Sequence, residues 1–197
     1  MQAERRLQCG QNQLVEAHGA EDFLQTTIAC AQRHAIAHDV LDAKAIAERF
    51  PQFRLEGDEV GCFEHGAGFV RPESCIAANI EVARRNGAEL RTGERLLRFE
   101  HDGAGVRVTT DRGEYAAARL VLTAGAWLPG FIPALRARVF RQVLFWFATD
   151  GPHEWFTGDR MPVYIRVPDA GTAMFYGFPA IDGPEGGIKM AGEQFEK

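Results

Sequence analysis

The sequence predicts a fold in two parts, an α/β segment followed by a mainly antiparallel sheet. A helical pattern from Pro72 to Asn86, followed by strand-like runs and turns up to Ala124, indicates the α/β segment. After Pro133 the chain changes to strand-like runs separated by turns rich in Gly, Pro and Asp, which indicates the antiparallel sheet. A chain of 197 residues, 46 % of them hydrophobic, is large enough to bury such a core.

The segment before residue 60 is predicted to hold two helices. A helix over 21–35 follows from three apolar residues on one helical face: Leu24, Ile28 and Ala31. Asp42 is predicted to cap a second, short helix, because its carboxylate can accept N–H groups of the first turn. Pro51 ends that helix. A short strand is expected to end at Leu14–Val15, and the glycine-dotted stretch 57–68 is predicted to be a loop.

The segment from 72 to 124 is predicted to run helix, strand, hairpin and buried strand. Pro72 suits the first turn of the helix and Gly87 its C-terminal cap. The apolar face of that helix is expected to consist of Ile76, Ile80 and Ala83. Strand-like runs follow at 89–92, 95–101, 106–109 and around Tyr115. The continuous apolar run Leu120-Val121-Leu122 predicts a strand buried on both faces.

Four further strands are predicted in the antiparallel part. They are Val139–Ala148, Pro162–Val167, Thr172–Phe178 and Ile188–Ala191. A boundary between two structural layers is expected near residues 130–138, where the pattern changes.

Composition and charge argue against several classes of protein. The net charge is −5 and the basic residues are scattered, so no nucleic-acid surface is expected. No apolar run approaches the roughly 20 residues needed to span a bilayer, so no membrane segment is expected. The polar first ten residues do not resemble a secretory signal, and a cytoplasmic location is predicted. The four cysteines form no CxxC pair, which predicts free thiols and no metal site.

Three places in the sequence could carry chemistry. The run Leu122–Trp127 takes a strand into a turn of small residues, where a ligand can approach closely; an ordinary strand-to-helix turn is the alternative. Lys189 lies between two apolar residues of a strand. Simple alternation directs it to solvent, whereas an inward lysine would place a cation beside an anionic intermediate. Tyr176 is either a packed aromatic or a hydroxyl in a pocket.

Several short segments, taken in their order along the chain, carry a family resemblance. They are Phe50-Pro51, Phe63–Val70, Asn86–Leu90, Thr123–Trp127, Arg141–Val143, Phe175–Pro179 and Gly187–Lys189. Each is weak alone, but the ordered set resembles the monomeric sarcosine oxidase and N-methyltryptophan oxidase family, which are flavin-dependent amine oxidases of the D-amino-acid oxidase superfamily. The resemblance extends from about Leu14 to Met190.

The resemblance implies a partial FAD-binding α/β domain, lacking its N-terminal βαβ unit, joined to a substrate domain with a mainly antiparallel sheet. The expected ranges are 1–60 for the helical part of the substrate domain, 61–135 for the partial FAD-binding domain and 136–197 for the substrate-domain sheet. The implied reaction oxidises a secondary amine, such as sarcosine or another N-methyl amino acid, to an imine. Reduced FAD then passes its electrons to molecular oxygen, and hydrogen peroxide is released.

The resemblance also implies roles for individual residues. Lys189 corresponds to the lysine beside flavin N5 that promotes oxygen reduction, where a cation would stabilise superoxide as it forms. Tyr176 corresponds to an active-site tyrosine. Five residues are expected near the dinucleotide: Arg95, Leu96, Gly125, Ala126 and Trp127.

The sequence departs from the family pattern at both ends. It has no GxGxxG motif between a strand and a helix, and it stops before the family's segment that carries the covalent flavin cysteine. The chain is therefore expected to be the middle piece of an oxidase, to hold FAD weakly and to be inactive by itself. Two alternatives stay open. One is a non-catalytic α+β module that forms a homo-oligomer through uncovered surfaces. The other is a relative of the D-amino-acid or glycine oxidases, or a dehydrogenase.

Overall fold

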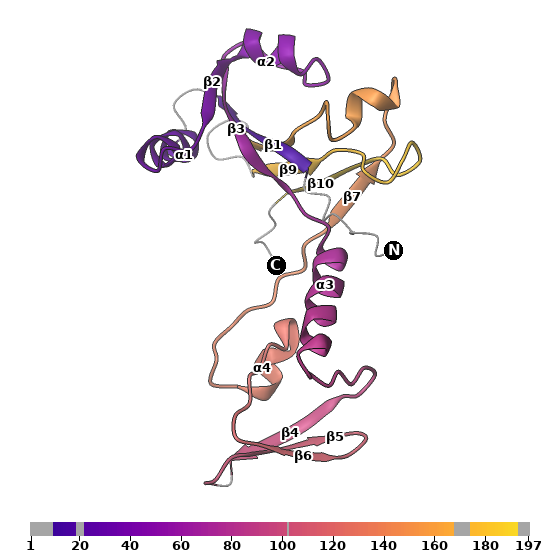
Figure 1. Cartoon of the computed structure of the whole chain (residues 1–197). Coiled ribbons are helices and arrows are strands. Elements are labelled where there is room, and N and C mark those ends of the chain that lie inside the picture. The colour runs from indigo at the N-terminus through magenta and orange to yellow at the C-terminus, as the bar shows by residue number, and fades with distance from the viewer. Residues whose placement is uncertain (1–9, 19–21, 102, 168–173, 193–197) are drawn as a thin grey trace. The chain divides into compact units, whose positions relative to one another are not determined.

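The structure is a computed structural model that describes residues 10–18, 22–101, 103–167 and 174–192. The chain divides into two compact units. The large unit comprises residues 1–75 and 140–197, and the small unit comprises residues 76–139. The large unit contains a seven-stranded sheet with two helices, and the small unit contains a three-stranded sheet (Figure 1).

The sheet of the large unit has the strand order β2-β3-β1-β8-β9-β10-β7. Its strands are β1 (Gly10–His18), β2 (His38–Asp42), β3 (Glu59–Phe69), β7 (Leu144–Phe147), β8 (Val163–Val167), β9 (Phe175–Phe178) and β10 (Ile188–Gly192). The pairing of β1 with β8 is parallel, and the other five pairings are antiparallel. The mainly antiparallel sheet expected from the sequence is thus confirmed.

Helices α1 (Asp22–Arg33) and α2 (Ala43–Arg49) cover opposite faces of this sheet. Neighbouring residues of a strand point to opposite faces. Phe63 packs in a cluster with Ile46 of α2, whereas Cys62 packs with Leu24 of α1. The α2 side holds the larger cluster: Leu14, Ile46, Phe50, Phe63, Met161 and Tyr164.

The two helices begin and end close to the predicted positions. The side chain of Asp42 accepts a hydrogen bond from the Ala45 N–H at 2.8 Å, as the capping prediction required. The backbone N–H of Phe50 donates to Ile46 at the end of α2, directly before Pro51. The strand predicted at Leu14–Val15 is part of β1, which extends to His18.

The prediction of a loop over 57–68 is wrong, because β3 runs from Glu59 to Phe69. Its backbone pairs with β2 at Val60–Glu64 and with β1 at Glu59–Glu64, Gly68 and Phe69, so ladder hydrogen bonds compensate for the weak strand preference of Gly61 and Gly68. The register with β1 shifts between Gln11 and Gln13, opposite residues 65–67 of β3, so the ladder is irregular at that place.

A buried ion pair joins β3 to β8. Glu59 is only 1 % exposed, and its carboxylate accepts hydrogen bonds from the Glu56 and Gly57 N–H groups, both at 2.7 Å. The Arg166 guanidinium lies 3.1 Å from the same carboxylate and also donates to the Arg54 carbonyl. The charge of Glu59 is therefore compensated by a cation and by two backbone donors, as a buried carboxylate requires.

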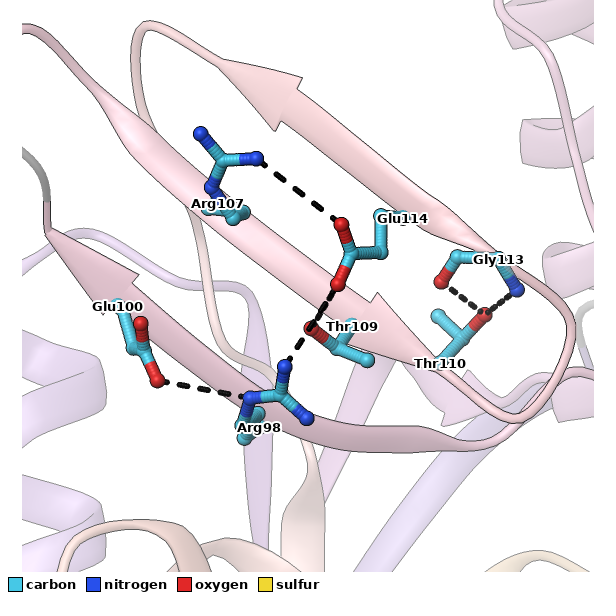
Figure 2. Close-up of polar contacts among 7 residues, drawn as sticks. All are labelled: Arg98, Glu100, Arg107, Thr109, Thr110, Gly113 and Glu114. Atoms are coloured by element: carbon cyan, nitrogen blue, oxygen red, sulfur yellow. Dashed lines mark hydrogen bonds and ion pairs between the residues drawn. The ribbon is translucent and has the colours of Figure 1, made fainter.

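The small unit contains most of α3 (Pro72–Arg85) and a three-stranded sheet of β4 (Leu96–His101), β5 (Val106–Thr110) and β6 (Glu114–Ala117). It ends with the 3-10 helix η1 (Gly125–Trp127) and the short helix α4 (Leu128–Phe131). Cross-strand ion pairs lie on one face of the sheet (Figure 2): Glu114 lies 3.6 Å from Arg98 and 3.9 Å from Arg107. These side chains are exposed, so the pairs contribute little to stability.

The cap of α3 follows the prediction, but its buried face does not. The Ala88 N–H donates to Ala83 and the Gly87 N–H to Arg84, which closes the helix at Gly87. No residue of α3 is buried, and Ile76 is exposed. The apolar face expected at Ile76, Ile80 and Ala83 therefore has no packing partner among the described residues that buries it.

Three strand predictions need correction. Residues 89–92 form no strand, and neither does Leu120-Val121-Leu122, where Val121 is 82 % exposed. A buried strand needs ladder partners at its edges and packed elements on its faces, and no described strand pairs with this run. The strand predicted over Val139–Ala148 is confined to Leu144–Phe147, where β10 provides a partner. No described helix is both long and apolar enough to cross a membrane.

We expect Glu59→Ala to lower the free energy of unfolding by about 3–5 kcal/mol, because the Arg166 charge would remain buried without its carboxylate. Urea denaturation followed by circular dichroism measures this loss. Glu48→Ala is the matched control, since Glu48 is exposed and pairs with Lys44 on the surface of α2. Its effect should stay below about 0.5 kcal/mol. Equal losses for the two variants would contradict a structural role for the buried pair.

Candidate functional site: a lysine among aromatic rings on the sheet

Lys189 lies on β10, between β9 and β7, on the face of the sheet opposite to α2. Its strand neighbours Ile188 and Met190 pack against the core cluster on the α2 side. Alternation along the strand therefore directs Lys189 to the other face. The lysine is half-buried there. Its side chain is neither inside the core nor extended freely into solvent. The observed position is therefore intermediate between the solvent-facing and the inward-facing lysine that the sequence left open.

Aromatic rings from both neighbouring strands lie beside the Lys189 ammonium. The register places Lys189 directly opposite Trp146 of β7 and Phe178 of β9. Its Nζ lies 5.2 Å from the centre of the Trp146 ring and 5.6 Å from the centre of the Phe178 ring. Both distances are within the range of a cation–π interaction. Across the described residues, no carboxylate forms an ion pair with this ammonium.

Tyr176 lies on the same face as Lys189, on the adjacent strand. It is two residues from Phe178 on β9, and the two rings meet edge to face with centres 6.0 Å apart. Phe69 contacts Phe178 in a second edge-to-face pair, with centres 6.3 Å apart. The structure thus brings together two of the predicted site residues, Lys189 and Tyr176, on one aromatic surface. We call this surface the lysine face; it consists of Lys189, Tyr176, Phe178 and Trp146.

Gly177, between Tyr176 and Phe178, faces the core side of the sheet, where there is no room for a larger side chain. It pairs with Tyr164 on β8, and a Cβ at Gly177 would lie 2.4 Å from the Tyr164 ring. Tyr164 is itself buried in the core cluster and contacts Phe53 and Phe175, so its ring has little room to move. The glycine of the Phe-Tyr-Gly-Phe segment is thus explained by packing on the core side.

Gly187 sets the start of β10. Its φ of +67° lies in the left-handed region that favours glycine. A Cβ at this position would lie 2.4 Å from the carbonyl oxygen of Phe147. The close approach of backbone to backbone allows Ile188 to pair with Phe147, and this register places Lys189 opposite Trp146.

The other predicted site residues belong to the small unit. Gly125, Ala126 and Trp127 form η1, in which the Trp127 N–H donates to Ala124 at 3.0 Å. Gly125 has a φ of +53°, which favours glycine there, and Trp127 is 77 % exposed. The structure therefore has the predicted turn of small residues. No described residue covers most of the Trp127 ring at its end.

Arg95 and Leu96 lie at the start of β4. Both backbone groups of Arg95 are used by Asp111, since its N–H donates to the Asp111 carboxylate and its carbonyl accepts from the Asp111 N–H. The guanidinium, which is exposed, remains the part of Arg95 that could contact a ligand. Leu96 is the first residue of the strand and pairs with Thr110.

Glu94, next to Arg95, is held in a small hydrogen-bond network. The hydroxyls of Thr110 and Tyr115 donate to its carboxylate at 2.5 and 2.6 Å. These two bonds hold the pKa of Glu94 below its usual value, with Thr110 the larger cause. The same contact with the Glu94 carboxylate raises the pKa of Tyr115. The network fixes the backbone around Arg95 and Leu96.

One described thiol, that of Cys62, is buried and has a raised pKa. No disulfide joins the three described cysteines, Cys30, Cys62 and Cys75, and Cys9 lies outside the described residues. Burial, together with the negative charges of Glu64 and Asp39, raises the pKa of the Cys62 thiol. Within the described ranges, no group of three His, Cys, Asp or Glu side chains is arranged to hold a metal ion.

The lysine face suits a flat, electron-accepting group such as a flavin ring. It combines one cation without a neutralising carboxylate among the described residues, one phenol and two further aromatic rings. An uncompensated cation stabilises negative charge that develops beside it, and aromatic side chains offer apolar contact to a flat ring. On the chemistry of these side chains, the residues fit the group that the sequence implies.

Similarity to known proteins places the chain in a family of flavoenzymes. A model of the FAD dependent oxidoreductase family matches residues 3–196. The chain therefore belongs to the FAD dependent oxidoreductase family, whose members use FAD as their cofactor.

Within this family, the chain is similar to amine oxidases. It is 42 % identical to monomeric sarcosine oxidase of Streptomyces avermitilis over 158 residues, which cover 79 % of this chain and 41 % of that protein. It is 32 % identical to N-methyl-L-tryptophan oxidase of Salmonella dublin over 80 % of this chain and 42 % of that protein. The chain thus spans about two fifths of the length of these curated relatives.

Solved structures support the same fold. NikD, described as an unusual amino acid oxidase essential for nikkomycin biosynthesis, matches with a TM-score of 0.74 and 26 % identity, over 98 % of this chain and 51 % of NikD. The L-proline dehydrogenase of P. horikoshii matches with a TM-score of 0.71 over 94 % of this chain and 49 % of that chain. Its 14 % identity supports the shared fold alone.

Sequence reasoning missed Trp146 and Phe178. Both lie on short aromatic strands, Leu144–Phe147 and Phe175–Phe178, and the aromatic character of these runs is visible in the sequence. The strand register is not visible, and only the register places the two rings on either side of Lys189.

We expect Gly177→Ala to lower the free energy of unfolding by about 1–3 kcal/mol, because its methyl group would overlap the buried Tyr164 ring. Thermal and urea denaturation measure the effect. The control is Gly66→Ala, which also lies in a strand but whose added methyl group would meet no heavy atom within 4 Å. An unchanged stability for Gly177→Ala would show that Tyr164 can move aside.

Proposed function

We propose that this chain is part of a flavin-dependent oxidase that converts a secondary amine, such as an N-methyl amino acid, to an imine with release of hydrogen peroxide. The observation that carries the proposal is the Lys189 ammonium, held on the lysine face at the position that the family resemblance assigns to the oxygen-activating lysine. The 42 % identity to a monomeric sarcosine oxidase supports the same substrate class.

In this proposal the two compact units take different roles. The large unit supplies the substrate domain, with the lysine face directed toward the flavin ring and the amine. The small unit, residues 76–139, supplies part of the FAD-binding domain and overlaps most of the proposed range 61–135. Its contacts to the dinucleotide come from η1 (Gly125, Ala126 and Trp127) and from Arg95 and Leu96.

The proposed reaction removes two electrons and two protons from the amine. Bound FAD supplies the redox chemistry, since it accepts the hydride equivalent from the C–H next to the nitrogen and returns the two electrons to oxygen. The nitrogen releases the second proton, and oxygen takes up two electrons and two protons to become hydrogen peroxide. Water then adds to the imine, which yields the free amine and a carbonyl compound.

Lys189 and Tyr176 have separate tasks in this scheme. The Lys189 ammonium stabilises the negative charge that develops on oxygen during its reduction, which is an electrostatic role. The Tyr176 hydroxyl donates a hydrogen bond to the substrate and orients its reacting C–H. Phe178 contacts the Tyr176 ring edge to face and limits its rotation.

One observation favours a second role in association. β7 is the outermost strand of the described sheet, and its four residues Leu144–Phe147 are all exposed. An exposed apolar edge strand is a site for pairing with another chain. We propose that a chain without further covering segments forms homo-oligomers through this edge, as the non-catalytic alternative required.

The chain of 197 residues should bind FAD only weakly, because its sequence contains no GxGxxG turn to hold the pyrophosphate at a helix N-terminus. Mixing with one equivalent of FAD, followed by gel filtration and the flavin absorbance of the protein peak, measures this. A stoichiometric yellow complex would contradict the expectation.

A chimaera tests the function without relying on weak FAD binding. In it, the matched segment of this chain replaces the corresponding 158 residues of the Streptomyces avermitilis monomeric sarcosine oxidase. We expect the chimaera to bind FAD and to produce hydrogen peroxide from sarcosine or another N-methyl amino acid, measured by a peroxidase-coupled assay. A chimaera that binds FAD but is not reduced by any N-methyl amino acid would refute the proposed function.

Lys189→Met in the same chimaera should slow the oxidation of reduced flavin by oxygen about 10²–10³-fold, since it removes the cation and keeps the length of the side chain. Flavin reduction by the amine under anaerobic conditions should change much less. Lys44→Met is the matched control, because Lys44 is exposed on α2 and pairs with Glu48 on the helix surface. Equal effects on both half-reactions would exclude the oxygen-specific role.

A further inference from the structure

Lys189 is the single positive charge on the three strands that form the lysine face. β7, β9 and β10 hold one other titratable side chain, that of Tyr176. Two other cations of the large unit, by contrast, pair with carboxylates: Arg49 with Asp39 at 3.0 Å, and Arg71 with Asp182 at 2.7 Å. The environment of Lys189 thus differs in kind from that of these arginines.

The two rings beside Lys189 come from opposite sides of its strand. Trp146 is its cross-strand neighbour on β7, and Phe178 is its cross-strand neighbour on β9. Directly opposed side chains of an antiparallel pair have Cβ atoms about 4.5–5.5 Å apart, so contact between them is built into the register. The flexible lysine side chain therefore has an aromatic ring on each side, although it remains half-buried.

We propose that Trp146 and Phe178 are positioning residues that hold the Lys189 ammonium in place by cation–π interactions. For its catalytic consequence, this inference rests on the proposed function of Lys189. The ring contacts themselves are a property of this chain, and they can be tested without flavin or substrate.

Neutral rings fix a cation without cancelling its charge. A carboxylate partner would hold the ammonium in place too, but it would bring a negative charge that offsets the field of the lysine. A ring attracts the cation through its quadrupole and carries no net charge. The full positive charge of Lys189 then remains available to a group that becomes negative beside it.

The two rings are not equally constrained. Phe178 is half-buried and has edge-to-face contacts with Phe69 and Tyr176. Trp146 is 59 % exposed and lies on the outermost strand of the described sheet. Phe178 is therefore the more constrained of the two rings. Trp146 contacts the ammonium from the edge strand and is the less constrained one.

The test is an NMR measurement on the 197-residue chain. The sequence has only three lysines, Lys44, Lys189 and Lys197. Reductive methylation with ¹³C-formaldehyde labels their amines and keeps the positive charge. Lys189→Arg and Lys44→Arg assign the signals by loss. We expect the Lys189 methyl signal to be shifted upfield from that of exposed Lys44, because its methyl groups lie beside the faces of the two rings.

Substitutions then identify the rings. Trp146→Leu and Phe178→Leu should each reduce the upfield shift, while Trp146→Phe should retain part of it, because an aromatic face is restored. The Lys44 signal should stay unchanged in all three variants, which serves as the control for intact folding.

The wild-type spectrum alone can overturn the proposal, even if a variant fails to fold. A Lys189 signal that coincides with that of Lys44 would show that no ring lies beside the ammonium. An upfield shift that is unchanged in both Trp146→Leu and Phe178→Leu would show that these two rings do not contact the ammonium. Neither result depends on amine oxidation, so failure of this inference is distinct from failure of the proposed function, which the flavin chimaera tests.

Discussion

Packing of Ile188 and Met190 against the core cluster determines where the Lys189 ammonium points. In a strand the side chains alternate between the two faces of the sheet, so two neighbours that pack on one face direct the residue between them to the opposite face. A shift of β10 by one residue would exchange the faces, which would bury the ammonium and expose the apolar side chains. The register of β10 against β7 and β9 is therefore maintained by the hydrophobic effect, and the position of the charge follows from it.

The same alternation explains how one short segment serves both packing and chemistry. Phe175 packs on the core side, where Gly177 leaves space for the Tyr164 ring. Tyr176 and Phe178 occupy the other face, beside Lys189. In the sequence Phe-Tyr-Gly-Phe, the first and third residues are thus constrained by packing in the core. The second and fourth are available for contact with a ligand.

Local features of this chain were predictable from its sequence, and features that depend on distant partners were not. The Asp42 cap and the helix end at Gly87 follow from hydrogen bonds within a few residues, and both are confirmed. The prediction of a loop at β3 is wrong because the strand is held by pairing with two distant strands, which its glycines do not reveal. Leu120–Leu122 was mistaken for a buried strand because an apolar run does not reveal whether partner strands exist. For the site, the family resemblance selected Lys189 and Tyr176, but the rings beside the lysine required the strand register.

The position of Trp146 at the edge of the sheet has a consequence for dynamics. A strand with one hydrogen-bonded neighbour opens locally at a lower free energy than a central strand, well before the whole domain unfolds. When β7 opens locally, Trp146 would move away from Lys189 and the ammonium would sample more positions, while the central strands stay paired. Sequence changes that stiffen this edge would narrow the range of positions that the charge samples, without touching the lysine itself.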